Sequence, residues 1–235
     1  STQSRSSAAS DVYKRQPAQQ VQAHAANGMP VLLSFAKYTP FLDKYQQTYP
    51  NILIDSGAFA ELNSGHKIDG VKYKEWQCQW GHADAIAGLD DISGNTARSL
   101  ENYTKYGGFP TMHDTDPKSV LPELIDISRE QGGNWLGIGL KPPREGKQDF
   151  IRWVLDNTPD DIHIHGWALR QYMHLSRLDS VDSTNWWRDA MDLRVIPLCK
   201  HLSYGECLDI TVKRYQRESR MIQKPQPVTA QLTFI

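Results

Sequence analysis

The chain has 235 residues, a formal net charge of −1 at pH 7 and seven tryptophans, a size typical of one α/β barrel. No apolar run approaches the roughly 20 residues that span a bilayer, and no charged segment precedes an apolar one as in a signal peptide, so we expect neither a membrane segment nor secretion. The near-zero charge gives nucleic-acid binding no general support, so such a partner requires a local basic patch.

The first sixteen residues, S-T-Q-S-R-S-S-A-A-S-D-V-Y-K-R-Q, differ from the rest of the chain. They are rich in serine and have no hydrophobic periodicity, so we expect a disordered or non-native tail. Residues 17–235 are then assigned to one domain. The three cysteines, Cys78, Cys199 and Cys207, are odd in number and irregular in spacing, which favours a reduced, cytoplasmic protein.

Eight short apolar runs follow the tail, and each is interpreted as a β-strand. In chain order they are Val31–Phe35, Ile52–Asp55, Ala85–Leu89, Phe109–His113, Leu136–Leu140, Ile162–His165, Ser180–Ser183 and Arg194–Leu198. Several are apolar on both faces, as expected for parallel strands that helices cover on the outside.

Amphipathic segments with helix-capping residues separate these runs. The predicted helices are Thr96–Tyr106, Lys118–Arg129, Thr184–Leu193 and Glu206–Arg220. The alternation of strands and helices predicts an α/β fold with a parallel sheet, and eight such units predict a (β/α)₈ TIM barrel. A doubly wound open sheet is the alternative, but no G-x-G-x-x-G follows the first strand.

Acidic residues and histidines collect at the C-terminal ends of the predicted strands. The residues there are Ser34, Asp55, Ser56, Asp90, Asp91, His113, Asp114, Lys141, His163, His165, Asp182 and Ser183. In barrels this rim holds the active site. A single acid after a strand is usually a helix N-cap, but the joint occurrence of several on one face indicates a functional site.

The residues alone leave several roles open. Asp55 is also suited to cap the turn at Ser56 and Gly57. His163 and His165 are two apart on one strand and share a face. They either bind a metal or substrate, or one is buried and hydrogen-bonded while the other lies at the rim. No C-x-x-C or H-x-x-x-H spacing supports a metal, and neither a G-x-S-x-G motif nor a P-loop is present. We therefore predict neither a metal nor a cofactor.

Several segments, in order, resemble the tRNA-guanine transglycosylase superfamily. L-I-D-S-G-A-F (Leu53–Phe59) resembles the family's D-S-G-G-[FY]-Q segment, and H-A-D-A-I-A-G-L-D-D-I (His82–Ile92) is similar to G-[SA]-D-I-x-M-x-[FL]-D-E. W-L-G-I-G-L-K-P (Trp135–Pro142) stands at the glycine-rich [FY]-x-[IV]-G-G-L. L-D-S-V-D-S-T (Leu178–Thr184) is similar to the D-x-F-D-C strand that carries the nucleophile. The resemblance covers roughly residues 31–187.

The resemblance implies a role for each matching residue. Asp182 would be the nucleophile that forms a covalent glycosyl-enzyme, and Asp55 the general acid/base. Asp90 would hold the purine, and His113 takes the place of a base-binding glutamine. The remaining residues assigned to the substrate pocket are Ser56, Gly57, Phe59, Asp91, Gly137, Gly139, Lys141, His163 and His165.

Two departures bear on the nucleic acid. The zinc site that follows the barrel in the tRNA enzymes has no match, and T-N-W-W-R-D (Thr184–Asp189) replaces P-T-R-x-x-R-x-G. This resembles the compact DNA-guanine transglycosylases of the DpdA type, found in phages and mobile elements, which place a 7-deazaguanine such as preQ0 into DNA. We therefore favour DNA over tRNA as the substrate, with a partner protein as a possible source of docking surface. Lys213–Lys224 is either a local basic patch or an ordinary solvated helix face.

Two other functions remain compatible with these residues. One is hydrolysis of an N-glycosidic bond without return of a base. The other is a non-catalytic, nucleic-acid-binding subunit of a modification complex. The retained set of carboxylates, Asp55, Asp90 and Asp182, argues against the second.

Overall fold

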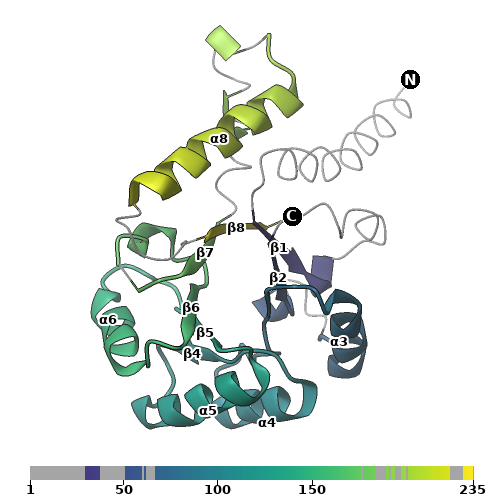
Figure 1. Ribbon diagram of the computed structural model, residues 1–235, viewed down its shortest axis with the longest axis vertical. Coiled ribbons are helices and arrows are strands. Elements are labelled where there is room, and N and C mark those ends of the chain that lie inside the picture. Colours follow the sequence, from purple (N-terminus) through teal and green to yellow (C-terminus); the bar gives the residue numbers. More distant parts are fainter. Residues whose placement is uncertain are drawn as a thin grey trace.

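Parallel strands form the centre of the molecule, and most helices lie outside them (Figure 1). The computed structural model describes residues 30–37, 51–59, 61, 67–175, 177–183, 189–190, 192–193, 197–199, 201–222 and 230–234. The strands are β1 Val31–Ser34, β2 Ile52–Asp55, β3 Ala85–Ile86, β4 Thr111–His113, β5 Trp135–Gly139, β6 His163–Gly166, β7 Ser180–Ser183 and β8 Ala230–Phe234. Neighbouring strands pair in parallel, in the order β3-β2-β1-β8-β7-β6-β5-β4. The α/β class with a parallel sheet is therefore confirmed.

Five α-helices accompany these strands in the described residues: α3 Gly70–Gln77, α4 Thr96–Tyr106, α5 Leu121–Gln131, α6 Gln148–Asn157 and α8 Tyr204–Ile222. Short 3-10 turns are η1 Phe35–Lys37, η3 Cys78–Trp80, η4 Lys118–Val120, η5 Arg170–Tyr172 and η6 Pro197–Cys199. Asn95 is the N-cap of α4, and its side chain accepts the N–H of Arg98 at 3.1 Å. Throughout the described ranges, no helix is both long enough and apolar enough to cross a membrane.

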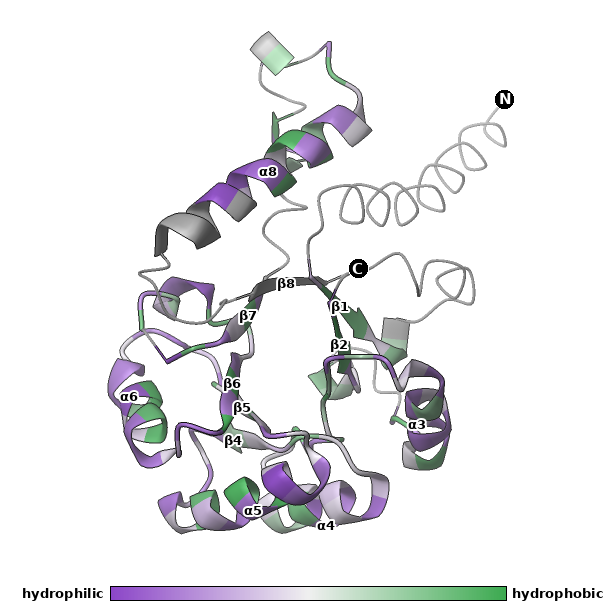
Figure 2. Cartoon of the chain, viewed as in Figure 1, coloured by the Kyte–Doolittle hydropathy of each residue, from purple (hydrophilic) through white to green (hydrophobic). Residues whose placement is uncertain are grey.

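The core lies between the strands and the helices. Figure 2 shows hydrophobic residues on strands such as β1 and β2 and hydrophilic residues on the outer parts of helices such as α3 and α6. The largest cluster joins β4–β7 to α4, α5 and α6 and includes Met112, Leu136 and Ile164, which are fully buried. In a second cluster, side chains of α3 pack against those of β1 and β2. Because helices cover the outer face, strands such as Ile52–Asp55 are apolar on both sides.

Seven of the eight predicted strands coincide with observed strands to within a few residues, and the prediction for the eighth was wrong. Within Arg194–Leu198, Pro197 and Leu198 belong to the 3-10 turn η6, and residues 194–196 lie outside the described residues. Proline cannot donate a hydrogen bond to a sheet, which disfavours this run as a central strand. The eighth strand is β8, which pairs with β7 and β1.

Most of the predicted helices also coincide with observed helices. Thr96–Tyr106 is confirmed at both ends, Lys118–Arg129 corresponds to η4 and α5, and Glu206–Arg220 lies inside α8. Of Thr184–Leu193, residues 184–188 and 191 lie outside the described residues, and 189–190 and 192–193 are helical. The sequence reasoning missed α3 and α6. The predicted tail, residues 1–16, also lies outside the described residues.

Candidate active site

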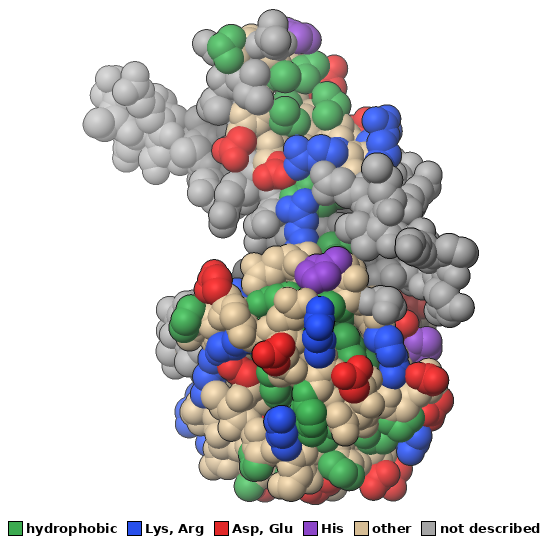
Figure 3. Space-filling view, turned by 90° about the vertical axis from the view of Figure 1, so that its left-hand side faces the viewer, with side chains coloured by type: hydrophobic (Ala, Val, Ile, Leu, Met, Phe, Trp, Pro, Cys, Tyr) green, Lys and Arg blue, Asp and Glu red, His purple; other side chains and the backbone are tan. Residues whose placement is uncertain are grey.

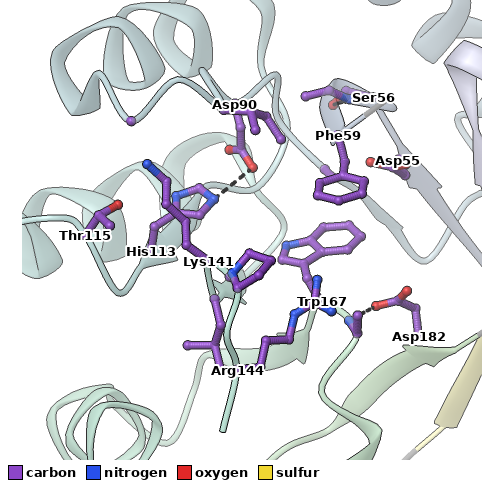
Figure 4. A pocket seen from close by; sticks show the side chains of 18 of the residues that line it. Asp55, Ser56, Phe59, Asp90, His113, Thr115, Lys141, Arg144, Trp167 and Asp182 are labelled. Carbon is purple, nitrogen blue, oxygen red and sulfur yellow. Dashed lines mark hydrogen bonds and ion pairs between the residues drawn. The ribbon is translucent and has the colours of Figure 1, made fainter. Parts of the chain in front are cut away.

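A cavity of about 1120 Å³ opens at the C-terminal ends of the strands. Asp55 ends β2, His113 ends β4 and Gly139 ends β5, and Asp182 is the third residue of β7. Figure 4 shows the side chains of Asp55, His113 and Asp182 around this space. Of the predicted site residues, those that line it are Asp55, Ser56, Phe59, Asp90, Asp91, His113, Gly139, Lys141 and Asp182.

Asp55 is held by the end of the neighbouring strand. Ser34 pairs with it in register across β1 and β2, and the Ser34 hydroxyl and the Gly57 N–H both hydrogen-bond to its carboxylate. Burial, helped by the charges of Asp182 and Asp90, outweighs these hydrogen bonds and raises the pKa of Asp55 to about 6. Asp55 therefore exchanges a proton near neutral pH, which suits a general acid/base.

Asp182 approaches the cavity from β7 and is only 4% exposed. One of its oxygens accepts a hydrogen bond from the backbone N–H of Ala168, in the loop after β6 (Figure 4). Ala168 has a φ of 53°, in the left-handed region that costs a non-glycine residue roughly 1 kcal/mol. This backbone conformation aims the N–H at the carboxylate and so fixes its orientation.

His165 lies behind Asp182 and is fully buried. Its Nδ1 is 2.8 Å from the hydroxyl of Ser180, its register partner on β7. Its Nε2 is 3.7 Å from a carboxylate oxygen of Asp182 and makes no hydrogen bond to any described residue. The ring also packs edge-on against Trp167, with centroids 4.3 Å apart. His165 is thus the buried, hydrogen-bonded member of the predicted histidine pair.

Asp90 follows β3 and faces His113 across the cavity wall. The Tyr103 hydroxyl donates a hydrogen bond to one Asp90 oxygen, and Nε2 of His113 lies 3.6 Å from the other (Figure 4). Burial raises the pKa of Asp90, and the charge of His113 and the hydrogen bond from Tyr103 offset this only in part. The Asp90 carboxyl is therefore positioned both to accept and to give up a proton.

His113 lies between two carboxylates. Its Nδ1 is 3.4 Å from Asp116, which also accepts the backbone N–H of His113 at 2.8 Å and the Thr96 hydroxyl at 2.6 Å. Burial lowers the pKa of His113, but the hydrogen bond to Asp116 and the charges of Asp90 and Asp116 outweigh it and raise that pKa above its ordinary value. The imidazole therefore favours its charged, two-donor form.

Asp91 lines the cavity but organises its own loop. Its carboxylate accepts the N–H of Ser93 at 2.9 Å and pairs with Arg98 at 3.2 Å. Asp90 and Asp91, adjacent in sequence, therefore have different roles, as expected for neighbouring side chains that point in different directions. Asp91 has the loop-capping role, and Asp90 is the one bound to His113.

Aromatic rings and glycines shape the rest of the wall. Trp167 directly follows β6 and stacks on Phe109, with an interplanar angle of 13°. A Cβ on Gly137 would lie 2.5 Å from Nε1 of Trp167, and one on Gly139 would lie 2.6 Å from the His113 ring. The glycines of W-L-G-I-G in β5 thus leave room for these two side chains.

Four predicted site residues do not line the cavity. Gly137 and His165 lie behind the wall as described above. Gly57, with φ of 77°, packs against β1 and η1, since a Cβ there would lie 2.4 Å from that of Ala36. His163 begins β6, at the end of the strand away from the cavity, where its side chain is 54% exposed and 3.5 Å from Asp179.

The basic segment Lys213–Lys224 lies partly on α8. Lys213 pairs with Asp209 at 2.7 Å and Arg214 pairs with Asp189, while residues 223–224 lie outside the described residues. On the face shown in Figure 3, Lys and Arg are interspersed with Asp and Glu. These pairings favour the interpretation of the segment as an ordinary solvated helix face.

Sequence reasoning missed two cations and one aromatic residue of the wall, Arg144, Arg170 and Trp167. Trp167 follows a strand directly, and this position is a signal in the sequence that identifies it. Arg144 and Arg170 lie farther along loops, where spacing from a strand end carries no information about direction.

None of the family models, curated proteins or solved structures compared with this chain matches it. The chemistry of the cavity therefore has to be argued from its own residues.

Proposed function

We propose that the chain is a base-exchange glycosyltransferase on a (β/α)₈ barrel, a guanine transglycosylase-like pentosyltransferase. The barrel is supported by the continuous order of eight parallel strands. A parallel bridge between Ala87 and Phe109 also joins the chain after β3 to the chain before β4, the two ends of that order. Barrel enzymes react at the C-terminal ends of their strands, where this cavity lies.

One observation carries the proposed activity: Asp55, Asp90 and Asp182, from three separate strands, border a single cavity that also contains Trp167. A planar base packed beside Trp167 presents its N–H groups to carboxylates, and a carboxylate on the ribose side is placed for displacement. The base must leave its stack to enter the cavity.

The three acids divide the reaction between them. The carboxylate of Asp182 attacks C1′ of the target nucleoside, and the C1′–N9 bond breaks with its electron pair on the guanine. Protonated Asp55 gives that base a proton, and Asp90 together with His113 binds its polar edge. The incoming base then returns a proton from its N9 to Asp55, attacks C1′ and displaces Asp182.

We favour guanine in DNA as the base replaced and a 7-deazaguanine such as preQ0 as the base inserted, with tRNA as the alternative polymer. The support is the resemblance of Leu53–Phe59 and Leu178–Thr184 to the transglycosylase segments, together with T-N-W-W-R-D (Thr184–Asp189) in place of the P-T-R-x-x-R-x-G segment of the tRNA enzymes.

The test is incorporation of labelled guanine and of preQ0 into DNA and tRNA offered in competition. Asp182→Asn should abolish incorporation and any covalent protein–nucleic acid adduct on a denaturing gel. Asp156→Asn, an exposed position on α6, is the matched control and should leave both unchanged. Failure of the folded wild type to incorporate a base into either polymer would refute the proposal.

The same assay separates the other two functions. Release of guanine without incorporation identifies a hydrolase. Binding of nucleic acid that is unchanged in Asp55→Ala and Asp182→Ala, with no turnover by the wild type, identifies a non-catalytic subunit.

A further inference from the structure

The loop after β5 is tied down at several points. Asp114 accepts the backbone N–H of Lys141 at 2.8 Å and also binds Nζ of Lys147. Nζ of Lys147 donates in turn to the carbonyl of Lys141 at 2.6 Å, and the Tyr172 hydroxyl donates to the carbonyl of Arg144 at 2.7 Å. The backbone that carries Lys141 and Arg144 is therefore fixed from both sides.

Among the described residues, the two cations that this loop presents to the cavity have no acidic partner. Lys147 is neutralised by Asp114, but neither Lys141 nor Arg144 forms an ion pair within the described part of the chain. Nε of Arg144 is buried and lacks a hydrogen-bond partner among the described residues. Buried polar groups are nearly always hydrogen-bonded, so an unpartnered guanidinium N–H in a cavity wall points to a ligand.

The side chain of Lys141 is also held in place by a neighbouring loop. Its Nζ lies against Gly94 in the loop after β3, where a Cβ would come within 2.6 Å of it. Gly94 has a φ of 93°, a conformation that favours glycine. Figure 4 shows Lys141 and Arg144 on the cavity wall, with Arg144 extending toward Trp167.

The acids of the cavity are already engaged elsewhere. Asp90 binds His113, Asp91 binds Arg98, and Asp182 accepts the N–H of Ala168. The loop after β5 therefore contributes positive charge that the neighbouring carboxylates do not cancel. The guanidinium fork of Arg144 suits a phosphate group, and Lys141 adds a second positive charge to the same cavity wall.

We infer that Arg144 forms a phosphate-binding subsite in this cavity, with Lys141 adding positive charge to the same wall, and that the subsite takes a phosphate attached to the nucleotide whose base enters the cavity. The inference rests on the proposed function for the identity of that nucleotide. The cavity volume of about 1120 Å³ exceeds the space that a base alone needs and accommodates a nucleotide. The subsite places the phosphate on the loop side and leaves the acids of β2 and β7 to the base and sugar.

The test is calorimetric binding of guanosine, guanosine 5′-monophosphate, guanosine 3′-monophosphate and a short single-stranded DNA containing one guanosine. Arg144→Gln should weaken binding of the phosphorylated ligand about tenfold or more and leave guanosine unchanged, because a hydrogen bond to a charged group is worth ~1.5 kcal/mol or more. Lys141→Gln should act in the same direction. Arg152→Gln, an exposed position on α6, is the charge-matched control.

The ligands distinguish the sources of the phosphate. Monophosphates that bind as tightly as the DNA assign the subsite to free nucleotides. Weaker binding of DNA that carries a neutral methylphosphonate beside the guanosine assigns it to a backbone phosphate, and the salt dependence of DNA binding should then also decrease in Arg144→Gln. Either result supports the subsite.

Equal affinity of the wild type for guanosine and for every phosphorylated ligand overturns the inference, as does an equal effect of Arg144→Gln and Arg152→Gln. If Arg144→Gln does not fold, the same binding measurements are made with Lys141→Gln and with Arg144→Lys, which keeps the charge. Binding is measured without base exchange. An inactive protein that binds nucleotide through Arg144 therefore refutes only the proposed activity, and an active protein whose variants bind normally refutes only the subsite.

Discussion

Asp55→Asn is expected to stabilise the folded protein at neutral pH while it removes base exchange. The pKa of Asp55 is raised from 3.8 to about 6 in the folded state, chiefly by burial of the carboxylate. Between these values the folded protein binds more protons than the unfolded chain, so its stability falls as the pH rises. Asparagine does not ionise and resembles the protonated acid in shape.

The size of the effect follows from the pKa shift. At about 1.4 kcal/mol per pKa unit, a shift of about two units makes ionised Asp55 cost the fold about 3 kcal/mol above pH 6. Below pH 4, where Asp55 is protonated in both states, this cost disappears. For a protein of this size we expect Asp55→Asn to raise the melting temperature by about 6–12 °C at pH 7.5 and by little near pH 4.

Urea denaturation of the wild type and of Asp55→Asn, at pH 7.5 and at pH 4, measures the difference in free energy of unfolding between the two proteins. Other titrating groups, such as Asp90 and His113, contribute to both proteins and largely cancel. Asp156→Asn is the control for replacement of an exposed acid and should show no such pH dependence. A stability difference that is the same at pH 4 and pH 7.5, or a wild type that is more stable than Asp55→Asn at pH 7.5, would refute the reasoning.

Two further predictions test the surroundings of the acids. Gly57→Ala should lower the free energy of unfolding by about 2 kcal/mol, since the new Cβ would lie 2.4 Å from that of Ala36 at a φ of 77°; Gly81→Ala, with no atom within 4 Å, should have little effect in the same denaturation assay. His113→Phe should raise the pKa of Asp90 further, because the charge of His113 now lowers it. A pH profile of kcat/KM whose acidic limb does not move to higher pH would contradict this.

The fold was predictable where local pattern and tertiary packing agree. Apolar runs such as Ile52–Asp55 are continuous because both faces of a central strand are buried, and this is visible in the sequence. The eighth strand was missed because Ala230–Phe234 alternates apolar and polar residues after a polar segment, whereas Arg194–Leu198 has a stronger apolar run. Pro197 was the signal against that run.

The site was predictable only as far as strand ends determine it. Asp55, His113 and Asp182 meet because parallel strands bring their C-terminal ends to one edge. Sequence cannot separate Asp90 from Asp91, since the distinction depends on Tyr103 and Arg98 in the following helix. These contacts are set by packing of α4, which sequence spacing does not describe.

The orientation of the loop residues depends on contacts with residues that are even farther away in the sequence. Arg144 faces the cavity because its loop is tied at two points. Its own carbonyl is bound by Tyr172, 28 residues later, and the N–H of Lys141 is bound by Asp114, which lies 27 residues before Lys141. No local sequence pattern predicts either of these hydrogen bonds. This is the physical reason that Arg144 was missed while Lys141 and the four acids of the wall were found.

Three unfavourable features lie at this cavity and support the proposed function. Asp55 has a raised pKa, Ala168 has a left-handed backbone, and Arg144 has a buried N–H without a described partner. Away from the cavity a comparable group is fully used: the guanidinium of Arg177 donates to the carbonyls at 155, 158 and 159, at 3.1, 2.7 and 3.0 Å. Backbone carbonyls of this fold thus bind one guanidinium through three hydrogen bonds, whereas Nε of Arg144 lacks a described partner and burial raises the pKa of Asp55. Such conflicts are retained where a ligand or a reaction requires them, so these features support the proposal that the protein acts at this cavity.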